Sequence, residues 1–297
     1  MMNERALEER IRRQSIWSRL EARGGPNGVT PSLVRELSIH RGQQGVFRDL
    51  AVTSSISDPE AGVAVGVLYT GRVYDDDVAS DGLIYHVPMT SRGVRDKNEV
   101  TAIDSCRFLS LPLFVVTKSH RRALLRDVHL GWVADFDPVA GQFLILFGEA
   151  APPDVDDAGE QDSFQLQVER KAIQSLRKGR PNQAAFRFSV LKRYGTTCAL
   201  CGISDKRLID AAHLCGVEEN GCDDPRNGLP LCLNHHQSID KGLVAIDPET
   251  LAILPVAADT SLELVGVTRT SIAHLSNLPH REALRWLWNR KRKTRAA

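Results

Sequence analysis

The chain has 297 residues, 42% of them hydrophobic and 25% charged, which is enough for two modest domains that each bury a core. Lys and Arg together number 38 against 37 Asp and Glu, so the formal net charge is only +1. This balance excludes a globally basic surface, and any affinity for nucleic acid must come from local clusters of basic residues.

The apolar runs of the chain carry no targeting or membrane signal. The first residues, MMNERALEERIRRQ, are charged and do not lead into an apolar run of signal-peptide length. The longest apolar runs, such as LSLPLFVV, are too short to cross a bilayer. Six cysteines indicate metal and thiol chemistry in a reducing compartment rather than a disulfide framework. A soluble, cytoplasmic protein without a membrane partner is expected.

The first segment, residues 1–40, is predicted to be helical. Residues 3–22 place Leu7 and Ile11 on one face of a helix, and GGPNG then ends it. A second, short helix is predicted after the capping residue Thr30, which precedes Pro31.

The next segment, residues 41–150, is predicted to be a β-barrel or a strongly curved sheet. Its apolar runs are short and are separated by Gly, Asp and Pro turns. The predicted strands are VAVGVLYTG, LIYHVPM, LPLFVVT, GWVADF and QFLILF.

An acidic and aromatic stretch, GRVYDDDVASDGLIYH, stands out within this segment, where Tyr74, Asp77 and Tyr85 are expected in turns. A base extruded from a duplex stacks on π faces, and a carboxylate distinguishes an amine from a carbonyl. The stretch resembles the pocket motif of the SET-and-RING-associated (SRA) domain, a PUA-like β-barrel that flips modified cytosine out of DNA. The resemblance implies that Tyr74 and Tyr85 stack on the base and that Asp77 accepts its amine. His86 takes the place of the usual small hydroxyl residue, and the alternative is an acidic surface turn with ordinary strand aromatics.

Residues 151–165 are acidic, contain Pro and lack large apolar runs, so an interdomain linker is predicted there. The remaining residues, 166–297, are predicted to form the second domain. A helix is expected over residues 163–194, ahead of a cysteine-rich segment, and another over residues 280–293. The chain ends in a basic cluster that is either a solvated terminus or an arm that contacts phosphates.

The cysteine-rich segment contains two half-sites for a metal. Cys198-x-x-Cys201 is followed some thirty residues later by Cys232-x-x-His235. Three thiolates and one imidazole complete a tetrahedral shell with no open position, which predicts a structural zinc. Cys215 and Cys222 fit no such spacing and are predicted to be loop or packing residues.

The zinc shell leaves His213, Asn227 and His236 unexplained. Their order, with NGLPLC and the HH pair in register with the zinc ligands, resembles the HNH endonuclease family over roughly residues 185–260. That family has a ββα-metal fold with one catalytic cation, here Mg²⁺ or Mn²⁺. The resemblance implies that His213 is the general base, that His236 binds the cation and that Asn227 orients the loop and the histidine. It also implies hydrolysis of phosphodiester bonds to 5′-phosphate and 3′-hydroxyl ends.

The second ligand of the catalytic cation is open in the sequence. Many family members have an acidic ligand directly before the first histidine, where this chain has Ala212. Asp240 is favoured, because it lies four residues after His236 on one face of a predicted helix. Asp210 is the rival, although an offset of three from His213 in a strand points it to the other face.

Together the two halves predict an α+β protein that is a modification-dependent restriction endonuclease. Its substrate would be double-stranded DNA that contains 5-methylcytosine or 5-hydroxymethylcytosine. Because one HNH centre cuts one strand, a homodimer is predicted for double-strand cleavage. The alternatives are a catalytically inactive regulator that binds modified sites, and an HNH nuclease whose first domain reads something else.

Overall fold

The computed structural model describes residues 4–42, 45–69, 78–87, 93–119, 122–152, 163–168, 182–256 and 259–293, except the side chains of 291–293. The chain divides into two compact units. The first comprises Met1–Asp157 with Gly179–Ala184, and the second comprises Ala158–Lys178 with Ala185–Ala297. Among the described residues, no helix has the length and apolarity needed to span a bilayer.

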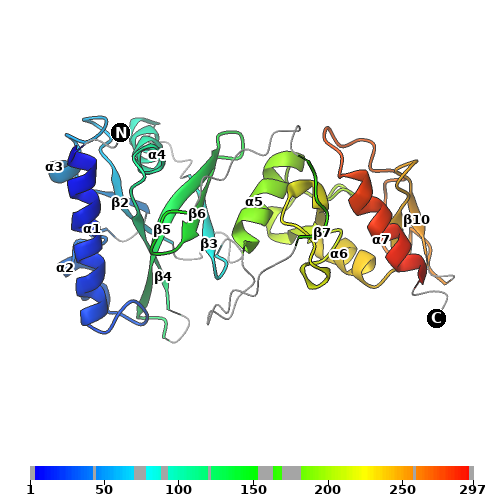
Figure 1. Ribbon diagram of the computed structural model, residues 1–297, viewed down its shortest axis with the longest axis horizontal. Coiled ribbons are helices and arrows are strands. Elements are labelled where there is room, and N and C mark those ends of the chain that lie inside the picture. Colours follow the sequence, from blue (N-terminus) through cyan, green and yellow to red (C-terminus); the bar gives the residue numbers. More distant parts are fainter. Residues whose placement is uncertain are drawn as a thin grey trace. The chain divides into compact units, whose positions relative to one another are not determined.

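The first unit is built on a six-stranded sheet with the order β1-β2-β4-β5-β6-β3 (Figure 1). Neighbouring strands are antiparallel except β2 and β4, which are parallel. The strands are β1 (Gly45–Arg48), β2 (Ala64–Leu68), β3 (Gly82–His86), β4 (Leu113–Lys118), β5 (Arg126–Asp137) and β6 (Gln142–Phe147).

Helices cover both faces of this sheet. Alternate residues of a strand point to opposite faces, so one strand contributes side chains to two separate cores. Phe114 and Val116 of β4 pack in one core with residues of α1 (Glu4–Ala22) and α2 (Pro31–Glu36). Leu113 and Val115 pack in a second core with residues of α4 (Gly93–Phe108). A short helix, α3 (Leu50–Thr53), follows β1.

The predicted barrel is wrong for the part of the chain that the structure describes. The sheet is open there, with β1 and β3 at its edges. The short apolar runs predicted five of the six strands, all except β1, but such runs do not specify whether a sheet closes. The sixteen residues of α4 also lie inside the stretch that was predicted to be all β, and this helix covers one face of the sheet.

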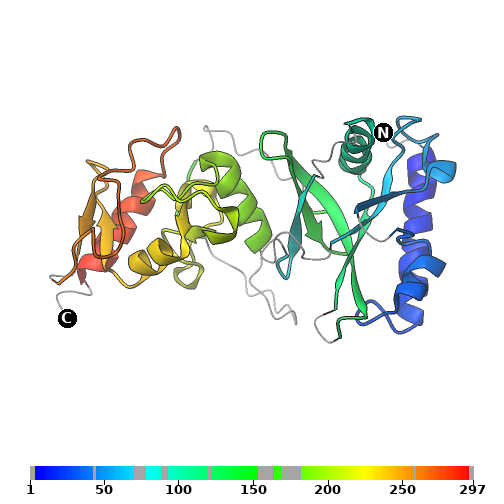
Figure 2. The same cartoon turned by 180° about the vertical axis from the view of Figure 1, so that it is seen from behind.

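The second unit contains a strand–strand–helix element, in which β7 (Ile209–His213) pairs antiparallel with β8 (Gly228–Cys232) and α6 (Leu233–Asp240) follows directly. Helix α5 (Gln183–Tyr194) precedes it, and β9 (Val244–Ile246), β10 (Ile253–Pro255) and α7 (Arg281–Lys293) follow. Figure 2 shows α7 beside the small β9–β10 sheet. Short 3₁₀ turns lie at Lys206–Leu208, Val217–Glu219 and Pro225–Asn227.

The predicted helices at both ends of the chain are confirmed. Thr30 caps α2 by accepting the backbone N–H of Leu33 at 3.3 Å. The helix predicted over residues 163–194 is confirmed only from Gln183 onwards. Residues 163–168 are not helical. Gln167 instead forms a β-bridge with Gly221, in the loop between β7 and β8.

Candidate active site and metal centre

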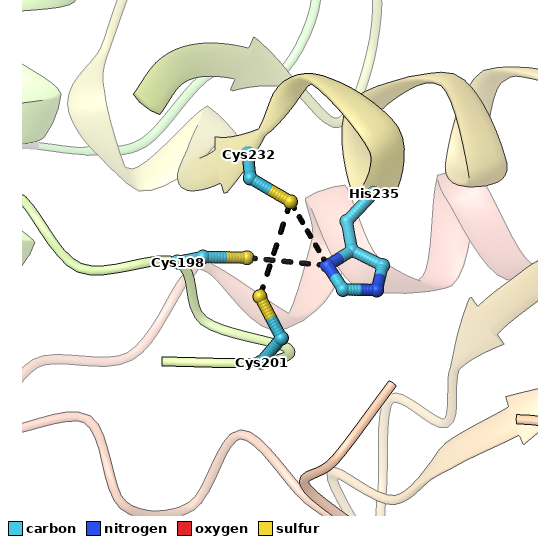
Figure 3. Close-up of side chains that lie close together, drawn as sticks. All are labelled: Cys198, Cys201, Cys232 and His235. Carbon is cyan, nitrogen blue, oxygen red and sulfur yellow. Dashed lines mark hydrogen bonds between the residues drawn. The ribbon is translucent and has the colours of Figure 1, made fainter. Parts of the chain in front are cut away.

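Four side chains of the second unit converge on one point. Cys198, Cys201, Cys232 and His235 have ligand atoms that all lie within 4.8 Å of one another (Figure 3). Nδ1 of His235 is 3.4 Å from Sγ of Cys198 and 3.2 Å from Sγ of Cys232. A tetrahedral shell with metal–sulfur bonds of about 2.3 Å separates its ligands by about 3.8 Å, so these atoms are placed to hold one metal ion. We call these residues the Cys3His cluster.

The other ring nitrogen of His235 is held by the backbone. Nε2 lies 3.1 Å from the carbonyl oxygen of Val265, which also accepts the side-chain amide of Asn234 at 2.7 Å. A carbonyl can only accept, so it fixes the proton on Nε2 and leaves the lone pair of Nδ1 directed at the cluster.

The thiols of the cluster lie close enough to shift one another's pKa values. Burial and the neighbouring Cys198 and Cys232 raise the pKa of Cys201 to about 12. Burial alone would raise the pKa of Cys198, but its contact with His235 and hydrogen bonds from backbone amides lower that pKa to about 6. Three thiolates this close repel one another unless a cation sits between them, so the donor set fits a divalent ion of the zinc type.

His213, the last residue of β7, is held on one ring face and at one ring nitrogen. Its imidazole stacks on Phe186 of α5, with ring centroids 3.5 Å apart and planes tilted by 10°. Its Nε2 lies 3.3 Å from Oδ1 of Asp223. Gly228 is paired with His213 across the ladder, and a Cβ there would lie 2.7 Å from Cζ of Phe186. The glycine is therefore what lets Phe186 approach.

Asn227 is fully buried and holds the loop between β7 and β8. Its Oδ1 accepts the backbone N–H of Cys215 at 2.9 Å, and its Nδ2 donates to the carbonyl oxygens of Cys215 at 3.0 Å and Cys222 at 2.9 Å. Its hydrogen bonds thus go to the backbone of the loop that follows His213. The two loop cysteines lie outside the Cys3His cluster, as predicted.

His236 lies between two carboxylates. Its Nδ1 is 3.0 Å from Oδ2 of Asp210 on β7, and its Nε2 is 3.6 Å from Oδ2 of Asp240 on α6. Burial raises the pKa of Asp210, but the hydrogen bond and charge of His236 and the charge of Arg187 together lower it below its usual value. Arg187 donates to Ile209 O at 2.8 Å and lies 3.4 Å from Oδ1 of Asp210.

The predicted base pocket is described only in part. Tyr74 and Asp77 lie outside the described residues. Tyr85 is on strand β3 and packs in the core shared with α4, so the expectation that it lies in a turn is wrong. Burial, with the charge of Glu99, raises the pKa of its hydroxyl. His86 ends the same strand, and its ring lies 3.3 Å from the side-chain amide of Gln142 on β6.

The strand–strand–helix element β7–β8–α6 thus carries His213 and His236 beside the Cys3His cluster. A family model described as "HNH endonuclease" matches residues 198–247, which span both metal half-sites, the β7–β8 loop and α6. These residues form an HNH endonuclease domain, and the protein is a nuclease.

Two solved structures are similar to the chain at low identity. A "Modification dependent TagI restriction endonuclease" is 18% identical with a TM-score of 0.34, and the match covers 90% of this chain and 93% of that chain. The "Type IV phosphorothioation-dependent restriction endonuclease ScoMcrA" is 13% identical with a TM-score of 0.26, with coverages of 85% and 56%. At these TM-scores the likeness carries no conclusion about this chain. Among curated proteins, no match was found.

Three residues of the site were not predicted from the sequence: Phe186, Arg187 and Asp223. The first two lie on a helix outside the matched segment, and their contacts with His213 and Asp210 depend on how α5 packs. Asp223 is followed by Asp224, and nothing in that pair indicates which carboxylate meets the histidine. The sequence signal that could have indicated a carboxylate near the histidine was the pair of acidic residues shortly before Asn227.

Proposed function

We propose that the protein is a modification-dependent restriction endonuclease, which hydrolyses phosphodiester bonds of DNA at sites marked by 5-methylcytosine or 5-hydroxymethylcytosine. The proposed hydrolysis rests on the imidazole of His213, which Phe186 and Asp223 hold in place. The same strand–strand–helix element also carries His236 and Asp240. A general base must be held in one orientation and one tautomer, and this environment supplies both.

The Cys3His cluster is assigned to structural zinc, and His236 with Asp240 to a catalytic Mg²⁺ or Mn²⁺. When its proton is on Nδ1 and shared with Asp210, neutral His236 directs the lone pair of Nε2 at the carboxylate of Asp240. Two acceptors that face each other repel, so His236 and Asp240 would be the residues that hold a cation. Asp210 is the weaker candidate, because Arg187 already offsets its charge.

A cation held there would supply Lewis-acid stabilisation of the charge on the scissile phosphate and its leaving oxygen. His213 takes a proton from the attacking water through the ring nitrogen that does not face Asp223. Asn227 keeps the loop that follows His213 in one conformation. The reaction leaves 5′-phosphate and 3′-hydroxyl ends.

Recognition of modified cytosine is assigned to the first unit. Its support is the aromatic and acidic stretch around Tyr74 and Asp77, together with a core separate from that of the nuclease domain. A homodimer is proposed for double-strand cleavage, because one HNH centre cuts one strand. A protein that stays monomeric on DNA and only nicks it contradicts this assembly.

The test is digestion of one plasmid in three forms, unmodified, 5-methylcytosine and 5-hydroxymethylcytosine, with Mg²⁺ or Mn²⁺. Cleavage is expected only for a modified form, and His213→Ala should lower its rate by about 10²- to 10⁴-fold, the usual contribution of a general base. A matched control is His274→Ala, which removes an exposed histidine whose Nδ1 lies 3.1 Å from the nearby backbone carbonyl oxygen of Ser271.

The outcomes separate the parts of the proposal. Equal cleavage of all three forms contradicts modified-base recognition and leaves an HNH nuclease with a different first domain. No cleavage of any form, with binding of modified DNA retained, favours a regulator without catalysis. Cleavage that survives in His213→Ala contradicts the assigned base.

A further inference from the structure

We propose that Asp223 is the positioning residue of the catalytic histidine: its carboxylate accepts the Nε2 proton of His213 and leaves Nδ1 as the nitrogen that deprotonates water. The inference rests on the proposed function, because it assigns a role within the same site. Asn227, to which the sequence assigned the orienting role, makes its side-chain hydrogen bonds with backbone atoms of Cys215 and Cys222 instead.

The first argument is the contact itself. Nε2 of His213 and Oδ1 of Asp223 are 3.3 Å apart, and about a fifth of each side chain is exposed. A carboxylate can only accept, so a neutral imidazole in this contact carries its proton on Nε2. The stack on Phe186 prevents the ring from tilting out of that contact. The same tautomer therefore presents the lone pair of Nδ1 to water.

The second argument is that the backbone around Asp223 is anchored on both sides. The residue before it is fixed because Cys222 N donates to Leu166 O at 2.9 Å and Cys222 O accepts from Asn227 Nδ2 at 2.9 Å. The residue after it is fixed because Asp224 O accepts from Asn227 N at 2.9 Å. Asn227 thus acts on His213 indirectly, by holding the loop that places Asp223.

The third argument is the charge that develops during the reaction. A proton of the attacking water moves to Nδ1, the water oxygen bonds to phosphorus, and the bond from phosphorus to the 3′ oxygen breaks. The electron pair leaves on the 3′ oxygen, which solvent protonates. His213 becomes an imidazolium, and the negative charge of Asp223 beside its Nε2 stabilises that cation as it forms.

Asp223→Asn tests this role in the full-length protein, with Asp224→Asn as the matched control. Both variants remove one negative charge from adjacent positions. The Asp224 carboxylate pairs with Arg226 at 2.7 Å and caps the turn that follows, and Asn keeps that cap. Asp223→Asn should lower kcat by about 10- to 100-fold with KM for DNA unchanged, the usual cost of losing a supporting carboxylate. Asp224→Asn should stay within about twofold of the wild-type kcat, as expected for a substitution away from the reacting atoms.

A spectroscopic measurement separates positioning from a general structural effect. The ¹⁵N shifts of His213 should report a proton on Nε2 in the wild type, and the Nδ1–H tautomer should gain population in Asp223→Ala. An Nδ1–H tautomer in the wild type, or no change in the variant, overturns the inference.

The kinetic results also distinguish this inference from the proposed function. If the wild type cuts DNA, His213→Ala does not, and Asp223→Asn keeps the wild-type kcat, only the role of Asp223 fails. If the wild type cuts no DNA, the proposed function fails, and the tautomer measurement still decides whether Asp223 sets the proton on His213.

Discussion

The two histidines that follow Cys232 belong to sites of opposite character. His235 is 1% exposed and closes the Cys3His cluster, whereas 25% of the His236 side chain is exposed, between two half-exposed carboxylates. Neighbouring residues of a helix point about 100° apart, so α6 serves both sites without sharing a ligand. A closed shell stabilises a fold, and an open one leaves room for water and substrate. The two sites should therefore separate stability from activity.

The largest effect is expected from removing a ligand of the closed cluster. Cys198→Ala leaves three ligands around the ion, and structural zinc in small domains contributes on the order of 10 kcal/mol to folding. The second unit should unfold and its bound zinc should be lost, which thermal melting and metal analysis measure together.

The control for this prediction is Cys222→Ala, which removes another buried thiol of the same unit from outside the cluster. It should keep its zinc content and its melting transition. If Cys198→Ala melts like the control and retains its metal, the cluster is not the zinc shell.

The contrast between the two sites also explains which residues were predictable. The ligands of the Cys3His cluster lie in two short spacings, Cys198-x-x-Cys201 and Cys232-x-x-His235, so the geometry is encoded locally. Asp223 meets His213 only because β7, β8 and the loop between them pack in a particular way. The ten-residue separation between His213 and Asp223 runs through a loop, so the sequence spacing does not predict that the two side chains meet.

The first unit shows the same limit at the scale of a fold. Short apolar runs between turn residues predicted five of its strands, but the order β1-β2-β4-β5-β6-β3 arises from pairings between distant segments. The parallel pairing of β2 with β4 requires a crossover, and α4 lies in the connection. No local pattern in the sequence distinguishes this open sheet from a barrel.

A smaller effect is expected at Asn227, which supports the open site from a buried position. Asn227→Ala removes the partners of Cys215 N–H and of two buried carbonyls. We expect the free energy of unfolding of the second unit to fall by about 3 kcal/mol or more, since three buried groups lose their partner and each unpaired buried group costs about 1 to 3 kcal/mol. Urea denaturation measures this, and kcat should fall as well because the loop that carries Asp223 is no longer fixed.

Asn234→Ala is the matched control, because Asn234 is exposed and its side-chain amide donates one hydrogen bond, to Val265 O. Its cost should stay below about 1 kcal/mol. Equal costs for the two asparagines would contradict the structural role assigned to Asn227.

The smallest change in stability is expected at Gly228, where it should come with a loss of activity. A Cβ there would lie 2.7 Å from Phe186 and 2.8 Å from Cγ2 of Val190, so Gly228→Ala must displace α5 side chains at about 1 to 3 kcal/mol. Zinc content should not change, because the Cys3His cluster lies at the other end of β8. The activity should fall, because Phe186 can no longer stack on His213.

Adding Phe186→Leu to this variant separates packing from catalysis. Leu is shorter and makes room for the new methyl group, so the double variant should recover stability relative to Gly228→Ala. It cannot stack on the imidazole, so its kcat should stay low. Recovery of both stability and kcat would show that His213 needs space rather than an aromatic partner, and the ring stack would then have no part in holding the base.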